Sequence, residues 1–155
     1  MIPKTLVLDV DGVLTTGQFV YTVDGKFSKT FGPHDSDGLK LLKGTLDIRA
    51  ISADHRGFAI SKKRVTEDMK IPLDLVSEEE RLQWFKDTVD LATTIYIADG
   101  MHDAKIFEHV GYAIAPGNAF FTAKEKAHFV TTAKSGEGAV AEACLHILEK
   151  FFPRN

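Results

Sequence analysis

The 155-residue sequence is poor in several features that would point to particular classes of protein. Cys144 is the single cysteine, which excludes an internal disulfide, and we expect a buried helix thiol there. No apolar run approaches the ~18 residues of a membrane-spanning helix, and residues 1–5 lack the core of a signal peptide. The net charge of −3 gives no indication of nucleic-acid binding. We therefore expect a cytoplasmic protein without membrane or nucleic-acid partners.

The composition is that of an ordinary globular chain, with 44% apolar and 26% charged residues. A chain of this length can bury most of its unfolded surface in one core. The sequence contains no internal repeat, low-complexity tract or linker. We therefore expect one domain over residues 1–155.

Strand-like and helix-like segments alternate along the chain, which favours an α/β fold with a mostly parallel sheet and right-handed crossovers. Residues 16–32 are an exception, because Asp24-Gly25 lies between two alternating segments, a pattern typical of a type I′ hairpin. Ser77 and Glu80 match a helix capping box. The predicted strands are 6–8, 46–52, 73–76, 93–98, 112–115 and 129–131. Four predicted helices span 58–69, 104–109, 119–127 and 139–151, and two further helices are expected to begin near residue 35 and after residue 77.

Two aspartates, Asp9 and Asp11, follow the first apolar strand directly. Residues at i and i+2 of an extended chain point to the same face, and Gly12 allows a turn after them. Ligands of open α/β sheets bind outside the carboxyl ends of the strands. Two neighbouring buried carboxylates repel unless a cation or a shared proton compensates them. The pair therefore indicates a reactive or cation-binding site, and the alternative is a solvated pair at a strand end.

A second acidic pair, Asp99 and Asp103, follows the apolar strand over 93–98. Taken alone, Asp99 is equally well explained as a helix N-cap and Asp103 as a first-turn acid. Beside the first pair this explanation is less favoured, and the second pair adds to the case for a reactive or cation-binding site.

The segment 9–15, Asp-Val-Asp-Gly-Val-Leu-Thr, resembles the nucleophile motif of the haloacid dehalogenase superfamily of phosphotransferases. The resemblance implies that Asp9 attacks phosphorus to form an aspartyl-phosphate, while Asp11 is the general acid and base. It also implies Mg²⁺ held by Asp9, Asp11 and the Val10 carbonyl. Thr15 is expected to assist or to contact the substrate.

The segment 99–103 resembles the magnesium motif of the same superfamily, with Asp99 as a direct ligand and Asp103 orienting the metal's waters or the neighbouring cation. The resemblance further implies that Ser52 binds the phosphoryl group, although a serine at a strand end is also a common helix cap. Arg81 stands where relatives carry the phosphate-binding lysine, and its planar guanidinium is no simple replacement for an ammonium group. Lys86 is the alternative cation.

The short spacings between Asp11, Ser52 and Arg81 leave no room for a cap domain. This layout resembles the capless group that includes 3-deoxy-D-manno-octulosonate 8-phosphate phosphatases and the phosphatase-like C-terminal domain of sialic acid cytidylyltransferases. The resemblance implies a Rossmann-like three-layer fold with a small β-hairpin insert and no cap. Residues 34–36 and 52–54 depart from these relatives. The remaining candidate substrate contacts are His34, Asp35 and Arg56.

The implied activity is magnesium-dependent hydrolysis of a phosphorylated sugar acid, of the octulosonate or nonulosonate 8- or 9-phosphate type, in a lipopolysaccharide or sialic-acid-like pathway. One alternative is a weak or inactive module that regulates a nucleotide-sugar biosynthesis partner. A phosphoryl transferase such as a mutase is less favoured, because it needs a cap to exclude water. The resemblance further implies a homotetramer in which the hairpin of a neighbouring subunit closes the site. Four aromatic residues of the hairpin fit such an interface; they are Phe19, Tyr21, Phe27 and Phe31.

Overall fold

A six-stranded parallel sheet forms the centre of the computed structural model, which describes residues 1–154. The strand order is β5-β4-β1-β6-β7-β8, and every neighbouring pair is parallel. The predicted α/β class with a parallel sheet is therefore confirmed. The bounds are β1 (Thr5–Asp9), β4 (Asp47–Ser52), β5 (Leu73–Leu75), β6 (Thr94–Ile97), β7 (Tyr112–Ala115) and β8 (Phe129–Val130).

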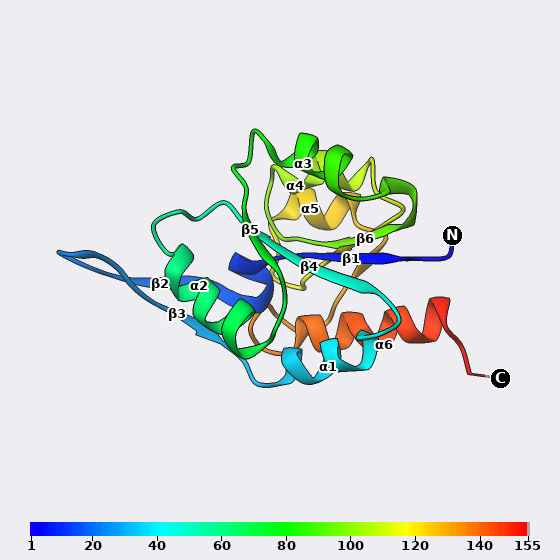
Figure 1. The fold of residues 1–155 in the computed structure, drawn as a ribbon, viewed down its shortest axis with the longest axis horizontal. Helices are drawn as coiled ribbons and strands as arrows, with labels where there is room; N and C mark the ends of the chain where they lie inside the picture. The colour runs from blue at the N-terminus through cyan, green and yellow to red at the C-terminus, as the bar shows by residue number, and fades with distance from the viewer. Residues whose placement is uncertain (155) are drawn as a thin grey trace.

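Helices cover both faces of the sheet, which gives three layers (Figure 1). The helices α3, α4 and α5 lie on one face, and α1 and α6 lie on the other. Their bounds, with that of the shorter α2, are α1 (His34–Leu42), α2 (Phe58–Lys62), α3 (Arg81–Thr88), α4 (Asp103–Phe107), α5 (Phe121–Lys126) and α6 (Ala139–Phe151). Residues 1–154 also form three short helical segments, η1 (Val10–Leu14), η2 (Lys63–Asp68), which continues α2, and η3 (Leu91–Thr93).

Alternation along β1 divides the core into two clusters, one on each face of the sheet. Leu6 and Leu8 belong to one cluster and Val7 to the other, because successive side chains of a strand point to opposite faces. Cys144 of α6 lies in the first cluster and is fully buried, and burial raises the pKa of its thiol to about 12. The predicted buried helix thiol is therefore confirmed.

The predicted hairpin consists of β2 (Thr15–Thr22) and β3 (Gly25–Phe31), which extend away from the sheet (Figure 1). The tight turn lies one residue earlier than the Asp24-Gly25 pattern indicates, since Thr22 pairs with Gly25. Neither Val23 nor Asp24 has a positive φ, so the predicted type I′ turn is wrong. Gly25 instead takes the positive φ of 108° just after the turn, and the Thr22 hydroxyl accepts the Asp24 N–H at 3.2 Å.

The predicted capping pair precedes α3. The Ser77 hydroxyl accepts the Glu80 N–H at 3.3 Å and donates to the Glu80 carboxylate at 2.9 Å. None of the helices formed by residues 1–154 combines the length and the apolar character that a membrane crossing requires.

Candidate active site

The carboxyl ends of three adjacent strands bring the two acidic motifs together. β1 ends at Asp9 and β4 at Ser52, while Asp99 follows shortly after β6. Because β1 lies between β4 and β6, these three residues meet at the carboxyl-terminal edge of the sheet, where the parallel strands end. A pocket of about 500 Å³ opens there, and Asp9, Asp11 and Asp99 all line it.

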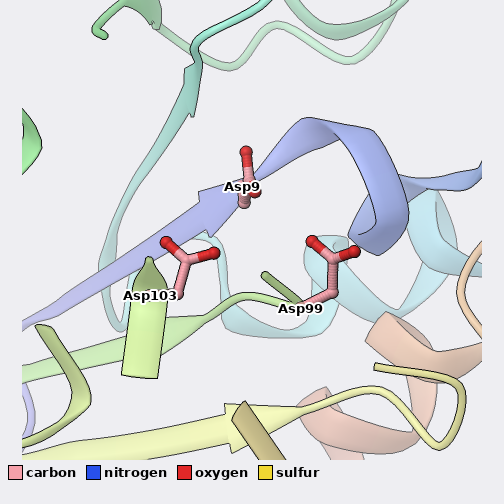
Figure 2. A group of neighbouring side chains, drawn as sticks. All are labelled: Asp9, Asp99 and Asp103. Atoms are coloured by element: carbon pink, nitrogen blue, oxygen red, sulfur yellow. The ribbon is translucent and has the colours of Figure 1, made fainter. Parts of the chain in front are cut away.

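Three carboxyl groups gather at this edge (Figure 2). Asp9, Asp99 and Asp103 each offer an oxygen atom, and these atoms all lie within 4.8 Å of one another. Asp9 and Asp103 are buried, and Asp99 is partly buried. The Asp9 carboxylate also accepts the N–H of Val10 at 2.9 Å, which fixes its orientation at the end of β1.

Burial and mutual repulsion make ionisation of these acids costly. Burial raises the pKa of Asp9 well above its usual value; Arg81 opposes the shift, and the charges of Asp103, Asp99 and Asp11 add to it. Burial, followed by the charge of Asp103, raises the pKa of Asp99 to about 7. A cation among these oxygens would relieve both costs. The donor set of clustered carboxylate oxygens therefore fits a hard divalent ion such as Mg²⁺.

Asp103 is held in place by three hydrogen-bond donors. Its carboxylate accepts hydrogen bonds from Arg81 Nη1 at 2.8 Å, from the Tyr96 hydroxyl at 2.6 Å and from the Gly100 N–H at 3.0 Å. The same Arg81 nitrogen lies 3.5 Å from Asp9 Oδ2, so one buried guanidinium faces two acids. Burial lowers the pKa of Arg81, but Tyr96 and the two aspartates outweigh this effect and raise it.

The turn after β1 brings the backbone directly against Asp99. Gly12 has a φ of 78°, in the left-handed region that favours glycine. A Cβ atom at this position would lie 2.0 Å from Asp99 Oδ2. A side chain at position 12 would therefore be strained and would displace the Asp99 carboxylate from its present position.

The Asp11 carboxylate faces a lysine of the hairpin and is not one of the three clustered acids. Lys29 Nζ lies 2.8 Å from Asp11 Oδ1 and 3.1 Å from Asp11 Oδ2. The Ser52 hydroxyl also donates to Asp11 Oδ2, at 3.3 Å. Asp11 is thus placed beside the residue at the end of β4, while its role as a metal ligand stays a prediction.

Sequence reasoning missed Lys26, Lys29 and Tyr96. The Lys29 side chain is fully buried, and Lys26 Nζ lies 2.6 Å from Asp54 Oδ2 at the pocket wall. Lysines in a hairpin are ordinarily exposed to solvent, so their presence in the sequence does not indicate a role in the site. Lys29 does lie two residues before Phe31, which packs against the core, and alternation therefore places both on one face of β3.

The other predicted site residues divide into those at the pocket and those away from it. Arg81 lines the pocket, whereas Lys86 is exposed in the last turn of α3. Thr15 is buried, and its hydroxyl accepts the N–H groups of Gly12 and Gly17, both at 3.1 Å.

His34, Asp35 and Arg56 do not line the pocket. His34 and Arg56 are exposed, and the Asp35 carboxylate accepts the Ala141 N–H at 3.1 Å, linking α1 to α6. Burial raises the pKa of Asp35. Both helices joined by this hydrogen bond lie on the same face of the sheet.

Comparisons with known proteins identify related sequences and similar folds. The family model for haloacid dehalogenase-like hydrolases matches residues 86–144. The 3-deoxy-D-manno-octulosonate 8-phosphate phosphatase of Haemophilus influenzae is 30% identical over 151 residues, which cover 94% of this chain and 83% of the relative.

Two solved structures share the fold over nearly their whole length. The cobalt-bound deoxy-D-mannose-octulosonate 8-phosphate phosphatase of Haemophilus influenzae has a TM-score of 0.81 at 28% identity, with 97% of this chain and 90% of that chain covered. The 3-deoxy-D-manno-octulosonate 8-phosphate phosphatase of Moraxella catarrhalis, in complex with magnesium, phosphate and KDO, has a TM-score of 0.82 at 27% identity, with 95% and 86% covered.

Proposed function

The chain belongs to the haloacid dehalogenase superfamily, within its octulosonate 8-phosphate phosphatase-like group, and is a phosphoric monoester hydrolase; from this premise we propose that it hydrolyses a phosphorylated sugar acid through a phosphorylated Asp9. The observation that carries the proposal is the position of Asp9, at the end of β1 in the pocket, with Asp99 and Asp103 oxygens within 4.8 Å.

Mg²⁺ is the proposed cofactor, because carboxylate oxygens suit it and because the Moraxella catarrhalis relative binds magnesium. Asp9 and Asp99 are its proposed side-chain ligands, and Asp103, which already binds Arg81, orients the surroundings. A bound Mg²⁺ supplies positive charge that offsets the phosphate oxygens and the clustered carboxylates.

The proposed reaction has two displacements. In the first, a carboxylate oxygen of Asp9 forms a bond to phosphorus, the bond to the sugar oxygen breaks, and Asp11 gives its proton to that oxygen. In the second, the oxygen of a water molecule forms a bond to phosphorus, the bond between phosphorus and Asp9 breaks, and Asp11 takes the proton of the water. Inorganic phosphate is released, and Asp9 and the protonated Asp11 are restored. Ser52 and Arg81 are proposed to hold phosphate oxygens, because phosphoryl transfer depends mainly on positioning and charge stabilisation.

The proposed substrate class is an octulosonate or nonulosonate with a terminal phosphate. The names of the relatives support the octulosonate 8-phosphate. Ala53 and Asp54 line the pocket, and they belong to the segment 52–54 in which we expect a departure from these relatives. Phosphate release from octulosonate 8-phosphate and nonulosonate 9-phosphate, compared side by side, distinguishes the two.

A second copy of the chain is the proposed partner of the hairpin. Phe19, Tyr21 and Phe27 are exposed in the single chain, whereas the fourth aromatic of the hairpin, Phe31, packs against the core. Phe19 also lines the pocket. Assembly into a homotetramer would cover these aromatic groups beside the mouth of the site.

The decisive test of the mechanism is Asp9→Asn. We expect turnover to fall by about four orders of magnitude, because the amide is not a nucleophile. The fold should be retained, since the amide oxygen can still accept the Val10 N–H. Phosphate release and circular dichroism are measured together, with EDTA-treated wild-type protein as the metal control. Substantial activity in either sample would refute the proposed mechanism.

A further inference from the structure

Lys29 of β3 is a buried cation whose ammonium group binds polar groups around the site. Its side chain is fully inaccessible to solvent. Its Nζ atom lies 2.8 Å from Asp11 Oδ1, 2.9 Å from Asp54 Oδ2 and 2.8 Å from the Ser61 hydroxyl. An ammonium group has three N–H donors, and these three partners use them all. Lys29 therefore has no donor left for a phosphate group in the pocket.

The partners of Lys29 are themselves held in place. Asp54 accepts from Lys26 Nζ at 2.6 Å and from the Gly57 N–H at 3.1 Å. Burial alone would raise the pKa of Asp54, but hydrogen bonds from Lys26, Lys29 and Gly57 lower it to about 2. Asp54 is thus an ionised group with a fixed orientation. Its negative charge lies between the positive charges of Lys26 and Lys29.

Asp11, in contrast, has one side open to the pocket. Its side chain is 28% exposed, and it lines the pocket. Lys29 contacts both of its oxygens, and Ser52 contacts one of them. Without these contacts an aspartate side chain is free to rotate about its terminal torsion. The orientation of the Asp11 carboxyl group therefore depends on Lys29.

We propose that Lys29 is a positioning residue for the proton-transfer step and that it acts through the Asp11 carboxylate. This inference rests on the proposed function, in which Asp11 protonates the leaving oxygen. It assigns the hairpin a role inside its own subunit, because β3 supplies the group that orients the acid.

The consequence is a selective effect on poor leaving groups. A basic leaving group needs a proton in the transition state, whereas a weakly basic one such as nitrophenolate does not. Loss of the contact between Lys29 and Asp11 should therefore slow phosphoryl transfer from phenyl phosphate to Asp9 much more than phosphoryl transfer from p-nitrophenyl phosphate. A residue that merely supports the fold would slow both transfers equally.

The experiment measures single-turnover release of phenols from a series of aryl phosphates of rising leaving-group basicity, with enzyme in excess. For Lys29→Met we expect a loss of about tenfold or more on phenyl phosphate and of about threefold or less on p-nitrophenyl phosphate. Asp11→Asn should show the same selectivity. The double variant should lose no more than Asp11→Asn alone, because both changes remove one function.

Lys26→Met is the matched control, since Lys26 lies on the same strand and binds the same Asp54 without contacting Asp11. It should lower the rates for all the aryl phosphates by a similar factor. If Lys29→Met does not fold, Ser61→Ala replaces it, because this change removes one acceptor of Lys29 and keeps its charge. A smaller loss with the same selectivity is then expected.

The outcomes separate the positioning role of Lys29 from the acid–base role of Asp11. Equal losses on all leaving groups for both Lys29→Met and Ser61→Ala, with a selective loss for Asp11→Asn, overturn the role of Lys29 alone. Equal losses for Asp11→Asn as well overturn the acid–base role of Asp11, and with it this inference.

Discussion

Asp99 is an acid of the cluster whose ionisation a bound cation would favour. Burial and Asp103 raise its pKa from 3.8 to about 7. Between these two values the metal-free native state holds a proton that the unfolded chain has lost. The free energy of unfolding therefore falls as pH rises through this window. A cation that binds the ionised form reverses the effect, because it stabilises only the folded protein.

We accordingly expect the melting temperature of the EDTA-treated protein to fall between pH 5 and pH 7, both set within the window of the Asp99 shift. Added Mg²⁺ should raise the melting temperature more at pH 7.5 than at pH 5, because protons compete for the same oxygens. Asp99→Asn is the control, and it should weaken both effects. Differential scanning fluorimetry provides the measurement, and a Mg²⁺ effect that is independent of pH would contradict the assignment of Asp99.

Arg81 is the second residue whose charge matters for both stability and binding. It is buried and faces Asp9 and Asp103, so Arg81→Ala should lower the free energy of unfolding by about 3 kcal/mol. It should also weaken phosphate inhibition. Lys86→Ala should change stability by about 0.5 kcal/mol or less and leave phosphate inhibition unaltered. Urea denaturation and phosphate inhibition decide the ranking, and the reverse order would show that Lys86, and not Arg81, stands at the position of the phosphate-binding lysine.

At the scale of elements, the turn η1 determines the distance between the two acidic motifs. It connects β1 to the hairpin strand β2, and Gly12 within it lies against Asp99. Thr15 supports this turn by accepting two backbone N–H groups. Thr15 was expected to assist catalysis, and in the structure its hydroxyl is engaged with the backbone of the turn.

Gly12→Ala tests this element against Gly44→Ala. Both glycines have a positive φ, 78° and 85°, so each alanine should cost about 1–2 kcal/mol of stability. A Cβ at Gly44 meets nothing within 4 Å, whereas a Cβ at Gly12 would overlap Asp99. Only Gly12→Ala should therefore lower kcat/KM, by about 10²-fold through misplacement of the acids. Equal activities for the two variants would mean that Asp99 tolerates displacement.

At the scale of the whole molecule, the hairpin leaves apolar surface that the single chain does not cover. Phe27 is 70% exposed, and Val23 at the tip is fully exposed. Such a protruding strand pair favours association with another chain. In the proposed tetramer, the hairpin of one subunit would lie close to the pocket of another.

Light scattering at micromolar concentration should give about four times the subunit mass of 17.1 kDa. Phe27→Ser should shift the protein towards smaller species, because it removes exposed apolar area at the proposed interface. Leu145→Ser, at an exposed apolar position on α6 away from the hairpin, is the control. A wild-type monomer with full activity would contradict the proposal.

The amino-acid sequence by itself determined the order of strands and helices, because periodicity and the ends of apolar runs are local properties. It also placed Asp9, Asp11, Asp99 and Ser52 at strand ends, where a parallel sheet collects its functional groups. The resemblance to a known family rested on the same short motifs. The hairpin was likewise evident from Asp24-Gly25, although the turn lies one residue earlier than that pattern indicates.

Only the tertiary structure decided which side chains meet. Lys29 lies 18 residues from Asp11, and Tyr96 lies 7 residues from Asp103, and neither contact has a sequence pattern. The structure also directed Asp35 to the N–H of Ala141, 106 residues away, instead of to the pocket. The physical reason is that burial and pairing of polar groups depend on packing between distant segments. Local spacing specifies where a side chain starts, and the folded neighbours determine what it touches.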